Sequence, residues 1–129
     1  MPIEPADLLY EEIRRDTEGV RLIAQHTRWK PTIIAKVKAH LFLELHDLDS
    51  YEHLDVRVSR ARFDSDPIIA ESWRRLKAGT FSFLDLQLLR HEAAEAWYMR
   101  KHGPSYRRAH AAAQKRYPAP LRLWLWLWS

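Results

Sequence analysis

One segment of this chain, residues 83–101, constrains the fold more than any other, because charged and apolar side chains share one face of its expected helix. At 3.6 residues per turn, an arc about 100° wide collects Leu84, Leu88, His91, Glu92, Glu95, Tyr98 and Met99. Glutamate is almost never fully buried without a partner. The fold must therefore bring a metal ion, another cation or hydrogen-bonding groups to this face.

The composition favours one mainly α-helical domain. The chain has 129 residues, of which 47% are hydrophobic, and this is long enough to bury one core. It has only three glycines and 29% charged residues, which is typical of a compact helical protein rather than a disordered one. We expect residues 1–129 to form a single compact domain of five or six helices, with a core over 5–118 and a Leu/Trp tail at 119–129.

Absent features narrow the class of protein. The chain has no cysteine, so disulfides and thiolate metal sites are excluded, and any metal must be held by His, Asp or Glu. The start of the chain lacks a basic stretch followed by an apolar one, and no run approaches the ~18 apolar residues of a membrane span. These observations predict a cytoplasmic protein without a signal peptide or a membrane span.

Prolines, glycines and capping residues mark the expected helix ends. Helices are predicted over residues 5–25 with a break favoured at Gly19, over 31–45, from Asp66-Pro67 to Gly79, over 83–101 behind a Ser82/Asp85 capping box, and from Ser105 to 116. Between them, residues 47–63 are the least regular, and Val56–Arg60 alternates like a short strand. The fold class is therefore mainly α.

The last two helices should form an antiparallel hairpin, because the turn at 103–105 is short. Glu95 lies about eight residues before this turn and His110 about six after it, so at 1.5 Å rise per residue their heights agree within roughly 3 Å. His110 shares a face with Tyr106, Ala113 and Tyr117 and should point inward. The hairpin is thus predicted to bring His110 to Glu95.

His91 and Glu95, four residues apart on one helix, can both reach a single ion, and His110 completes a set of two imidazoles and one carboxylate. Such a set fits a divalent metal ion, zinc first, with manganese or iron as alternatives. Glu92 is adjacent and is placed to take a proton from the metal-bound water. The run resembles the His-Glu-x-x-His helix of zinc peptidases, with Glu95 in the place of the second His.

Simpler roles compete with the metal site. His91 and Glu95 could pair with Arg or Tyr groups in the core without any catalysis. His40 lies at the margin of an apolar stripe and is more simply a structural residue that could approach the site helix. His46 is near a helix end, where the simpler role is to complement the helix dipole.

The charge is distributed unevenly along the chain. The net charge is +4 and the last acidic residue is Glu95; the seven cations beyond it contribute +7, so the rest of the chain sums to −3. This asymmetry predicts an anionic partner, nucleic acid above all, and a solvated basic helix is the alternative. The candidate nucleic-acid-binding residues are Arg100, Lys101, Arg107, Arg108, Lys115 and Arg116.

The tail Leu123–Trp128 alternates leucine and tryptophan, so in an extended conformation the three indoles fall on one side. It is expected to pack on the domain or to mediate self-association. Contact with a membrane interface, where Trp is favoured, is the alternative.

A longer pattern covers about residues 35–118. It consists of Lys38-x-His40-x-Phe42 with His46, Arg62-Phe63-Asp64-x-Asp66, Ile69-Ala70-x-x-Trp73-x-Arg75-Leu76-x-x-Gly79, Asp85-x-x-Leu88-Leu89-x-His91-Glu92-x-x-Glu95 and Gly103-x-Ser105-Tyr106-x-x-Ala109-His110-x-x-Ala113. This pattern resembles a C-terminal toxin domain of bacterial polymorphic toxins, of the Rhs and contact-dependent types. The resemblance implies an antibacterial effector, with an immunity protein as partner, that acts in the cytoplasm of the target cell. Its matching polar positions add His46 to Glu92 as a catalytic residue.

Together these features favour a metal-dependent hydrolase of toxin type, a nuclease acting on RNA or DNA. A zincin-like metallopeptidase would use the same ligands but needs an edge strand to pair with a peptide, for which Val56–Arg60 is the candidate. A helical module that binds nucleic acid or protein without catalysis is the remaining alternative.

Overall fold

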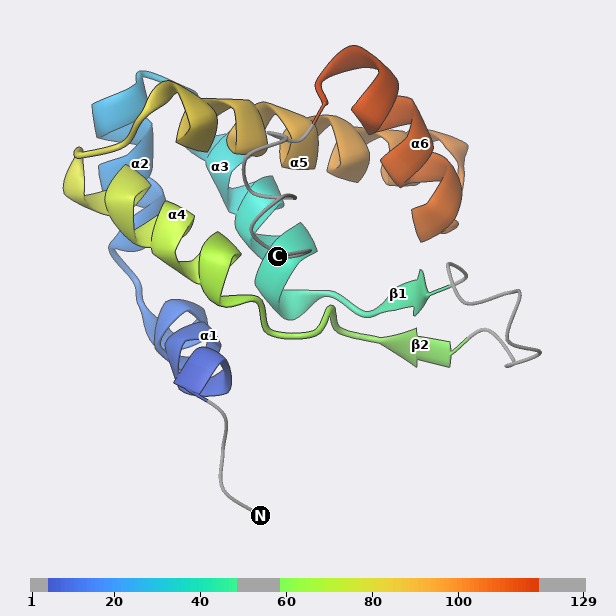
Figure 1. Ribbon diagram of the computed structural model, residues 1–129, viewed down its shortest axis with the longest axis horizontal. Coiled ribbons are helices and arrows are strands. Elements are labelled where there is room, and N and C mark those ends of the chain that lie inside the picture. The colour runs from blue at the N-terminus through green and yellow to red at the C-terminus, as the bar shows by residue number, and fades with distance from the viewer. Residues whose placement is uncertain (1–4, 49–58, 119–129) are drawn as a thin grey trace, which may run out of the picture.

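The computed structural model describes residues 5–48 and 59–118 and is mainly helical, as predicted (Figure 1). Its α-helices are α1 (Pro5–Arg15), α2 (Gly19–Thr27), α3 (Pro31–Lys38), α4 (Pro67–Ala78), α5 (Phe83–His102) and α6 (Tyr106–Arg116). A π-helical turn, η1 (Ala39–Leu43), continues α3, and two short strands, β1 (His46–Leu48) and β2 (Ser59–Ala61), pair with each other. None of the described helices is long and apolar enough to cross a membrane.

The predicted helix starts are confirmed by their caps. The Asp66 side chain accepts a hydrogen bond from the Ile68 N–H at 2.8 Å at the start of α4. Ser82 and Asp85 form a reciprocal capping box at the start of α5, and the Ser105 hydroxyl accepts from the Arg108 N–H of α6. Short-range hydrogen bonds of this kind are encoded by neighbouring residues, so the sequence suffices to predict them.

Two expected helices differ in the structure. The helix expected over 5–25 is divided into α1 and α2, with Gly19 as the first residue of α2. The helix expected to reach residue 45 ends as an α-helix at Lys38 and widens into η1, where the Glu44 N–H reaches back five residues to the Ala39 carbonyl. The wider turn buries three consecutive residues, His40, Leu41 and Phe42. Turns of this type are frequent at functional sites.

The two strands form an antiparallel pair that extends from the helical body (Figure 1). His46 pairs with Ala61 and Leu48 with Ser59. Of the strand expected at 56–60, Ser59 and Arg60 lie in β2, which ends at Ala61. Residues 56–58, Arg122 and the Leu123–Trp128 tail lie outside the described residues.

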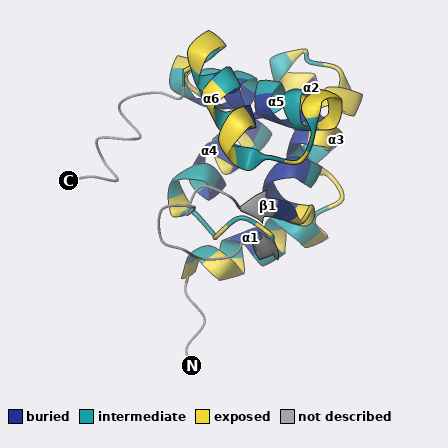
Figure 2. Ribbon diagram, turned by 90° about the vertical axis from the view of Figure 1, so that its right-hand side faces the viewer, coloured by how far each residue is buried: buried dark blue, intermediate teal, exposed yellow. Residues whose placement is uncertain are grey.

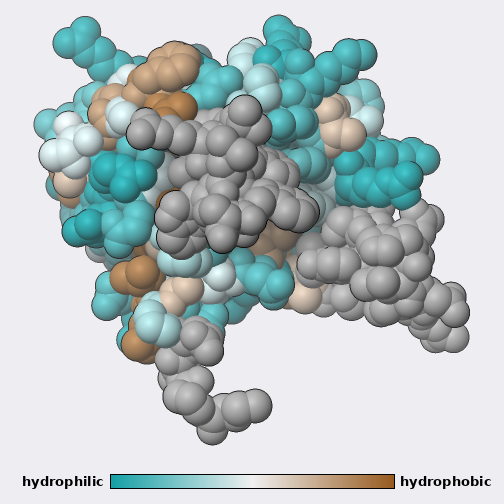
Figure 3. Space-filling model, viewed as in Figure 1, coloured by the Kyte–Doolittle hydropathy of each residue, from teal (hydrophilic) through white to brown (hydrophobic). Residues whose placement is uncertain are grey.

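The hydrophobic core joins the first five helices and η1. The Tyr10 and Phe42 rings meet edge to face at 4.8 Å, and Phe42 meets Trp73 in the same way at 5.2 Å. The buried faces of the helices turn toward one another (Figure 2), and the face seen in Figure 3 is largely hydrophilic where it is described. His40 precedes core residues Leu41 and Phe42 in η1, so the core fixes the turn that presents it.

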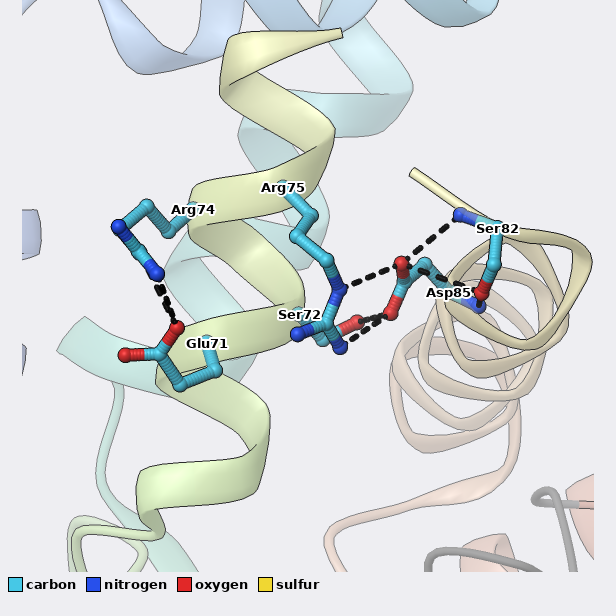
Figure 4. A network of polar contacts seen from close by, with 6 residues as sticks. All are labelled: Glu71, Ser72, Arg74, Arg75, Ser82 and Asp85. Atoms are coloured by element: carbon cyan, nitrogen blue, oxygen red, sulfur yellow. Dashed lines mark hydrogen bonds and ion pairs between the residues drawn. The ribbon is translucent and has the colours of Figure 1, made fainter. Parts of the chain in front are cut away.

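A buried carboxylate joins α4 to the start of α5 (Figure 4). Asp85 accepts hydrogen bonds from Ser72 Oγ at 2.7 Å, from Arg75 Nε at 2.9 Å and Nη2 at 2.8 Å, and from the Ser82 N–H at 3.0 Å. Its side chain is 2% exposed. This network fixes the direction in which α5 leaves α4, and thereby the placement of the residues further along α5.

Gly79 ends α4 in the left-handed conformation, with φ +79°, and a Cβ there would lie 3.2 Å from His26 ring atoms. We expect Gly79→Ala to lower the free energy of unfolding by about 1–2 kcal/mol, because both the backbone and the contact disfavour it. Denaturant unfolding measures the loss. An asparagine at this position contacts the same ring but tolerates positive φ better than alanine, so Gly79→Asn should lower the free energy of unfolding by less. An equal loss in both variants would contradict the contribution of the backbone conformation.

Candidate metal centre

The Glu95 carboxylate lies at the centre of a buried group of imidazoles from three segments of the chain. Glu95 Oε1 is 2.7 Å from Nε2 of His40, and Glu95 Oε2 is 3.2 Å from both Nε2 of His91 and Nδ1 of His110. Glu92 Oε2 lies 3.5 Å from the same Nε2 of His40. We call Glu95, Glu92, His40, His91 and His110 the Glu95 cluster.

The hairpin of α5 and α6 assembles most of this cluster. Three contacts follow one another along it: Gln87 Nε2 with the Pro118 carbonyl at 3.2 Å, His91 with the Tyr117 carbonyl at 2.9 Å, and Glu95 with His110. Residues with higher numbers on α5 contact residues with lower numbers in the segment 106–118. This order confirms the predicted antiparallel packing. The predicted metal ligands His91, Glu95 and His110 therefore meet.

The cluster is sheltered and has one partly exposed member, His110. His40, His91 and Glu95 are 1–2% exposed and Glu92 is 7% exposed. The His110 side chain is 29% exposed. Within the described residues, a water molecule or a substrate would thus reach the cluster past His110.

A backbone carbonyl fixes the orientation and tautomer of His91. The Tyr117 carbonyl can only accept, so the Nδ1 of His91, 2.9 Å away, carries the hydrogen. Nε2 faces Glu95 Oε2 at 3.2 Å: the protonated ring donates to that carboxylate, and the neutral ring would offer its Nε2 lone pair to an ion. Metal-binding histidines are commonly held in this way, with one ring N–H donated to a carbonyl and the other nitrogen directed at the ion.

The electrostatics of the cluster follow from burial opposed by close opposite charges. Burial alone would lower the pKa of His40, but Glu92 and Glu95 outweigh it and raise that pKa to about 9. Burial likewise opposes the rise in the pKa of His91, which Glu95 and Glu92 bring about. Burial would raise the pKa of Glu95, but hydrogen bonds from His110, His40 and His91 hold it well below its ordinary value. Glu95 is therefore an anion with three imidazole partners.

Glu92 is in the opposite situation. Burial, together with the nearby charge of Glu95, raises its pKa. Its Oε2 is the buried side-chain polar atom that has no hydrogen-bond partner among the described residues. His40 Nε2 lies 3.5 Å from that oxygen, outside good hydrogen-bond distance, and is closer to Glu95 Oε1, at 2.7 Å. A buried oxygen without a partner is costly, and it requires a proton or a cation.

Two sets of potential metal ligands share Glu95. One is His91, Glu95 and His110, and the other is His40, Glu92 and Glu95; within each set the ligand atoms lie within 4.8 Å of one another. Imidazole and carboxylate ligands suit zinc, manganese and iron. The alternative of pairing with arginine does not describe this site, because the described ion pairs of Glu95 are with histidines and Arg75 pairs with Asp85.

Two histidines from the middle of the chain are also brought to the site. His40, which the sequence favoured as a structural residue, contacts Glu95 directly. His46, predicted to be catalytic, donates from Nε2 to the His40 carbonyl at 2.6 Å and stacks on Phe63 at 4.2 Å. Burial lowers the pKa of His46. In this position it supports the turn that carries His40.

Sequence reasoning missed Phe63 as part of the site. Its ring lies 5.2 Å from the His40 ring and 4.8 Å from the Tyr106 ring, so it closes the cluster on the β2 side. Its only signal in the sequence was its place in Arg62-Phe63-Asp64, next to two charged residues.

The six predicted basic residues are all exposed, and two of them lie away from the cluster. Arg100 and Arg116 line a cavity of about 760 Å³ between α3, α5 and α6. Ala93 and Trp97, which also line it, are each two residues from Glu95 on α5, about 200° around the helix. The cavity therefore lies behind α5, on the face opposite the Glu95 cluster.

The cluster thus combines a buried anion, three imidazoles and a buried carboxylate oxygen without a hydrogen-bond partner among the described residues, and it reaches solvent through His110. A scan against models of known protein families finds no match to the chain, and searches of the curated proteins and of the solved structures find no similar protein.

Proposed function

We propose that this protein is a metal-dependent hydrolase of antibacterial-toxin type that cleaves RNA or DNA. The observation that carries the proposal is the convergence of His91, Glu95 and His110, with the Nδ1 of His91 held by the Tyr117 carbonyl and its Nε2 directed at Glu95. These residues would hold a divalent ion, zinc first, with manganese or iron as alternatives.

The chemistry divides between the ion and Glu92. A bound divalent ion acidifies water and neutralises charge that develops on a phosphoryl group. In hydrolysis the oxygen of the attacking water forms the new P–O bond, and its proton passes to Glu92. The ester P–O bond breaks, and its electron pair leaves on the departing oxygen, which takes a proton from solvent. Burial and the charge of Glu95 raise the pKa of Glu92, so its carboxylate is a stronger proton acceptor than that of an ordinary glutamate.

The substrate class is inferred from the charge around the opening. His110 is the partly exposed member of the cluster, and Arg107 lies one turn before it on α6. Arg108 is exposed and lies two residues before His110 on α6. Cations on the helix that borders the site would position phosphates by contacts that do not depend on base sequence.

The proposal is tested by metal analysis of the purified protein, followed by incubation with plasmid DNA, RNA and casein with and without a chelator. We expect bound metal and chelator-sensitive loss of nucleic acid. Cleavage of casein alone would favour the peptidase, for which the β1–β2 pair offers an edge. Absence of both metal and cleavage would leave a binding module.

Glu92→Gln is expected to lower turnover at least 100-fold while the ion at His91, Glu95 and His110 is retained, because the amide cannot accept the proton. Turnover and metal content are measured on the same preparation. Glu71→Gln, which removes a surface carboxylate paired with Arg74, is the matched control. An active Glu92→Gln variant would exclude the base role.

Arg107→Ala combined with Arg108→Ala should weaken nucleic-acid binding and reduce the slope of log K against log salt concentration by up to about 2, because two phosphate contacts are lost. Binding is measured by titration at several salt concentrations. Arg21→Ala with Arg74→Ala removes the same charge from surface ion pairs elsewhere and should leave the slope unchanged. An identical slope in both double variants would contradict this placement of the substrate.

A toxin-type activity also implies growth arrest when the chain is produced in bacterial cytoplasm, and an immunity protein that relieves it. Comparison of the wild-type chain with the Glu92→Gln variant tests this part of the proposal. Normal growth of cells that produce the wild-type chain would argue against a toxin-type activity.

A further inference from the structure

The two oxygens of Glu95 have different partners. Oε2 contacts Nε2 of His91 and Nδ1 of His110, each at 3.2 Å, and these are the ligands of the ion proposed above. Oε1 contacts Nε2 of His40 at 2.7 Å, on the side where η1 packs against α5. The carboxylate thus faces two separate groups of ligand atoms.

On the side of Glu95 that faces His40 lies a potential metal ligand that lacks a hydrogen-bond partner among the described residues. Glu92 Oε2 is buried without a hydrogen-bond partner, and it lies 3.5 Å from the same His40 Nε2. Two buried carboxylates that face one imidazole nitrogen cannot both be satisfied by its single hydrogen. A divalent cation in place of that hydrogen would bind all three atoms at once.

We propose that His40, Glu92 and Glu95 bind a second divalent metal ion, so that Glu95 bridges two ions through its two oxygens. The inference rests on the metal site of the proposed function, which supplies the first ion. The ligand class is a first-row divalent cation such as manganese or zinc, because one imidazole and two carboxylates suit these ions.

The surroundings of His40 are those of a positioned ligand. His46 donates to the His40 carbonyl at 2.6 Å, and Phe63 packs against both imidazole rings. These contacts hold the π-helical turn in one conformation. Metal sites with two ions about 3.5–4 Å apart recur in enzymes that cleave phosphate esters, where the pair stabilises the attacking and leaving oxygens.

The second ion would change the role of Glu92. In the protein with one ion its carboxylate is available as a base, and in the protein with two ions it is a ligand. Glu92→Gln then loses the second ion and retains the first, which agrees with the retained metal expected for that variant.

The test is a titration of the full chain with Mn²⁺, with bound metal measured by equilibrium dialysis and the ions observed by electron paramagnetic resonance. We expect two ions per wild-type chain, with a spectrum that shows coupling between them. His40→Gln and Glu92→Gln should each bind one ion and lose the coupling. His102→Gln, an exposed histidine outside the cluster, should keep both ions and the coupling.

Saturation of the wild type at one ion would overturn the second site, as would two coupled ions in both His40→Gln and Glu92→Gln. Glu92→Gln keeps the shape of the side chain, so it remains informative if the His40 variant does not fold. The proposed function fails differently: two coupled ions without nucleic-acid cleavage would refute the activity and leave the site, whereas one ion with cleavage would do the reverse.

Discussion

Glu95→Gln is expected to lower the affinity for divalent metal at least 100-fold and to abolish hydrolysis, the largest functional loss of any single substitution in the chain. The amide keeps the size of the side chain but removes the negative charge to which His40, His91 and His110 are all hydrogen-bonded. A neutral amide offers one weak ligand oxygen, and its NH₂ group would point at the place of an ion. Both ligand sets contain Glu95, so both are lost.

The same substitution should lower the free energy of unfolding, by roughly 3–5 kcal/mol, because it leaves the buried His40 imidazolium without its nearest anion. Bound metal, turnover and denaturant unfolding are measured together, and circular dichroism reports whether the helices remain. Glu95→Asp retains the charge but withdraws it by one methylene, so it should keep more of the metal affinity than the glutamine variant. Unchanged metal content in Glu95→Gln would remove this residue from the ligand set.

Asp85→Asn is expected to produce the largest loss of stability outside the Glu95 cluster, about 3 kcal/mol. The buried carboxylate accepts from Ser72, Arg75 and Ser82, and the amide cannot accept all of these hydrogen bonds (Figure 4). Denaturant unfolding at neutral pH measures the difference. Glu71→Gln is the control in the same helix pair: it breaks an exposed pair with Arg74 and should change stability by less than about 1 kcal/mol.

The pH dependence provides a second measurement of the same network. Burial would raise the pKa of Asp85, but hydrogen bonds from Arg75, Ser82 and Ser72 outweigh it and lower the pKa from 3.8 to about 2. Because the folded-state value is depressed, the stabilisation is complete above about pH 4 and is lost as the pH falls toward 2. The amount is about 2 kcal/mol. The asparagine variant should lack this part of the acid dependence, and equal acid sensitivity in both proteins would contradict the assignment.

Much of the fold was predictable because its signals are local. The caps at Asp66, Ser82 and Ser105 and the glycine at 79 act on residues within a few positions, and each predicted boundary is found in the structure. The hairpin of α5 and α6 was predictable for a related reason, since a short turn and a constant rise per residue determine which residues face each other. The proximity of His91, Glu95 and His110 could therefore be predicted from the sequence.

The end of α3 could not be predicted in this way. Residues 31–45 have a periodicity that suits a continuous helix, yet the chain widens at η1 and leaves the helix after Leu43. The wider turn is stabilised by its burial and by the hydrogen bond from His46 to the His40 carbonyl, and these depend on packing against the rest of the molecule. Helical propensity alone favours the regular continuation.

The sequence by itself determined the helices, their order, the hairpin and the need for a partner at Glu92 and Glu95, because periodicity and capping act over a few residues. Only the tertiary structure decided which side chain from outside the hairpin contacts these carboxylates. His40 is 55 residues from Glu95 along the chain, and it meets that carboxylate because the core places η1 against α5. Contacts at such separations depend on the packing of whole helices, so no local pattern records them, and for that reason the second set of ligands was visible only in three dimensions.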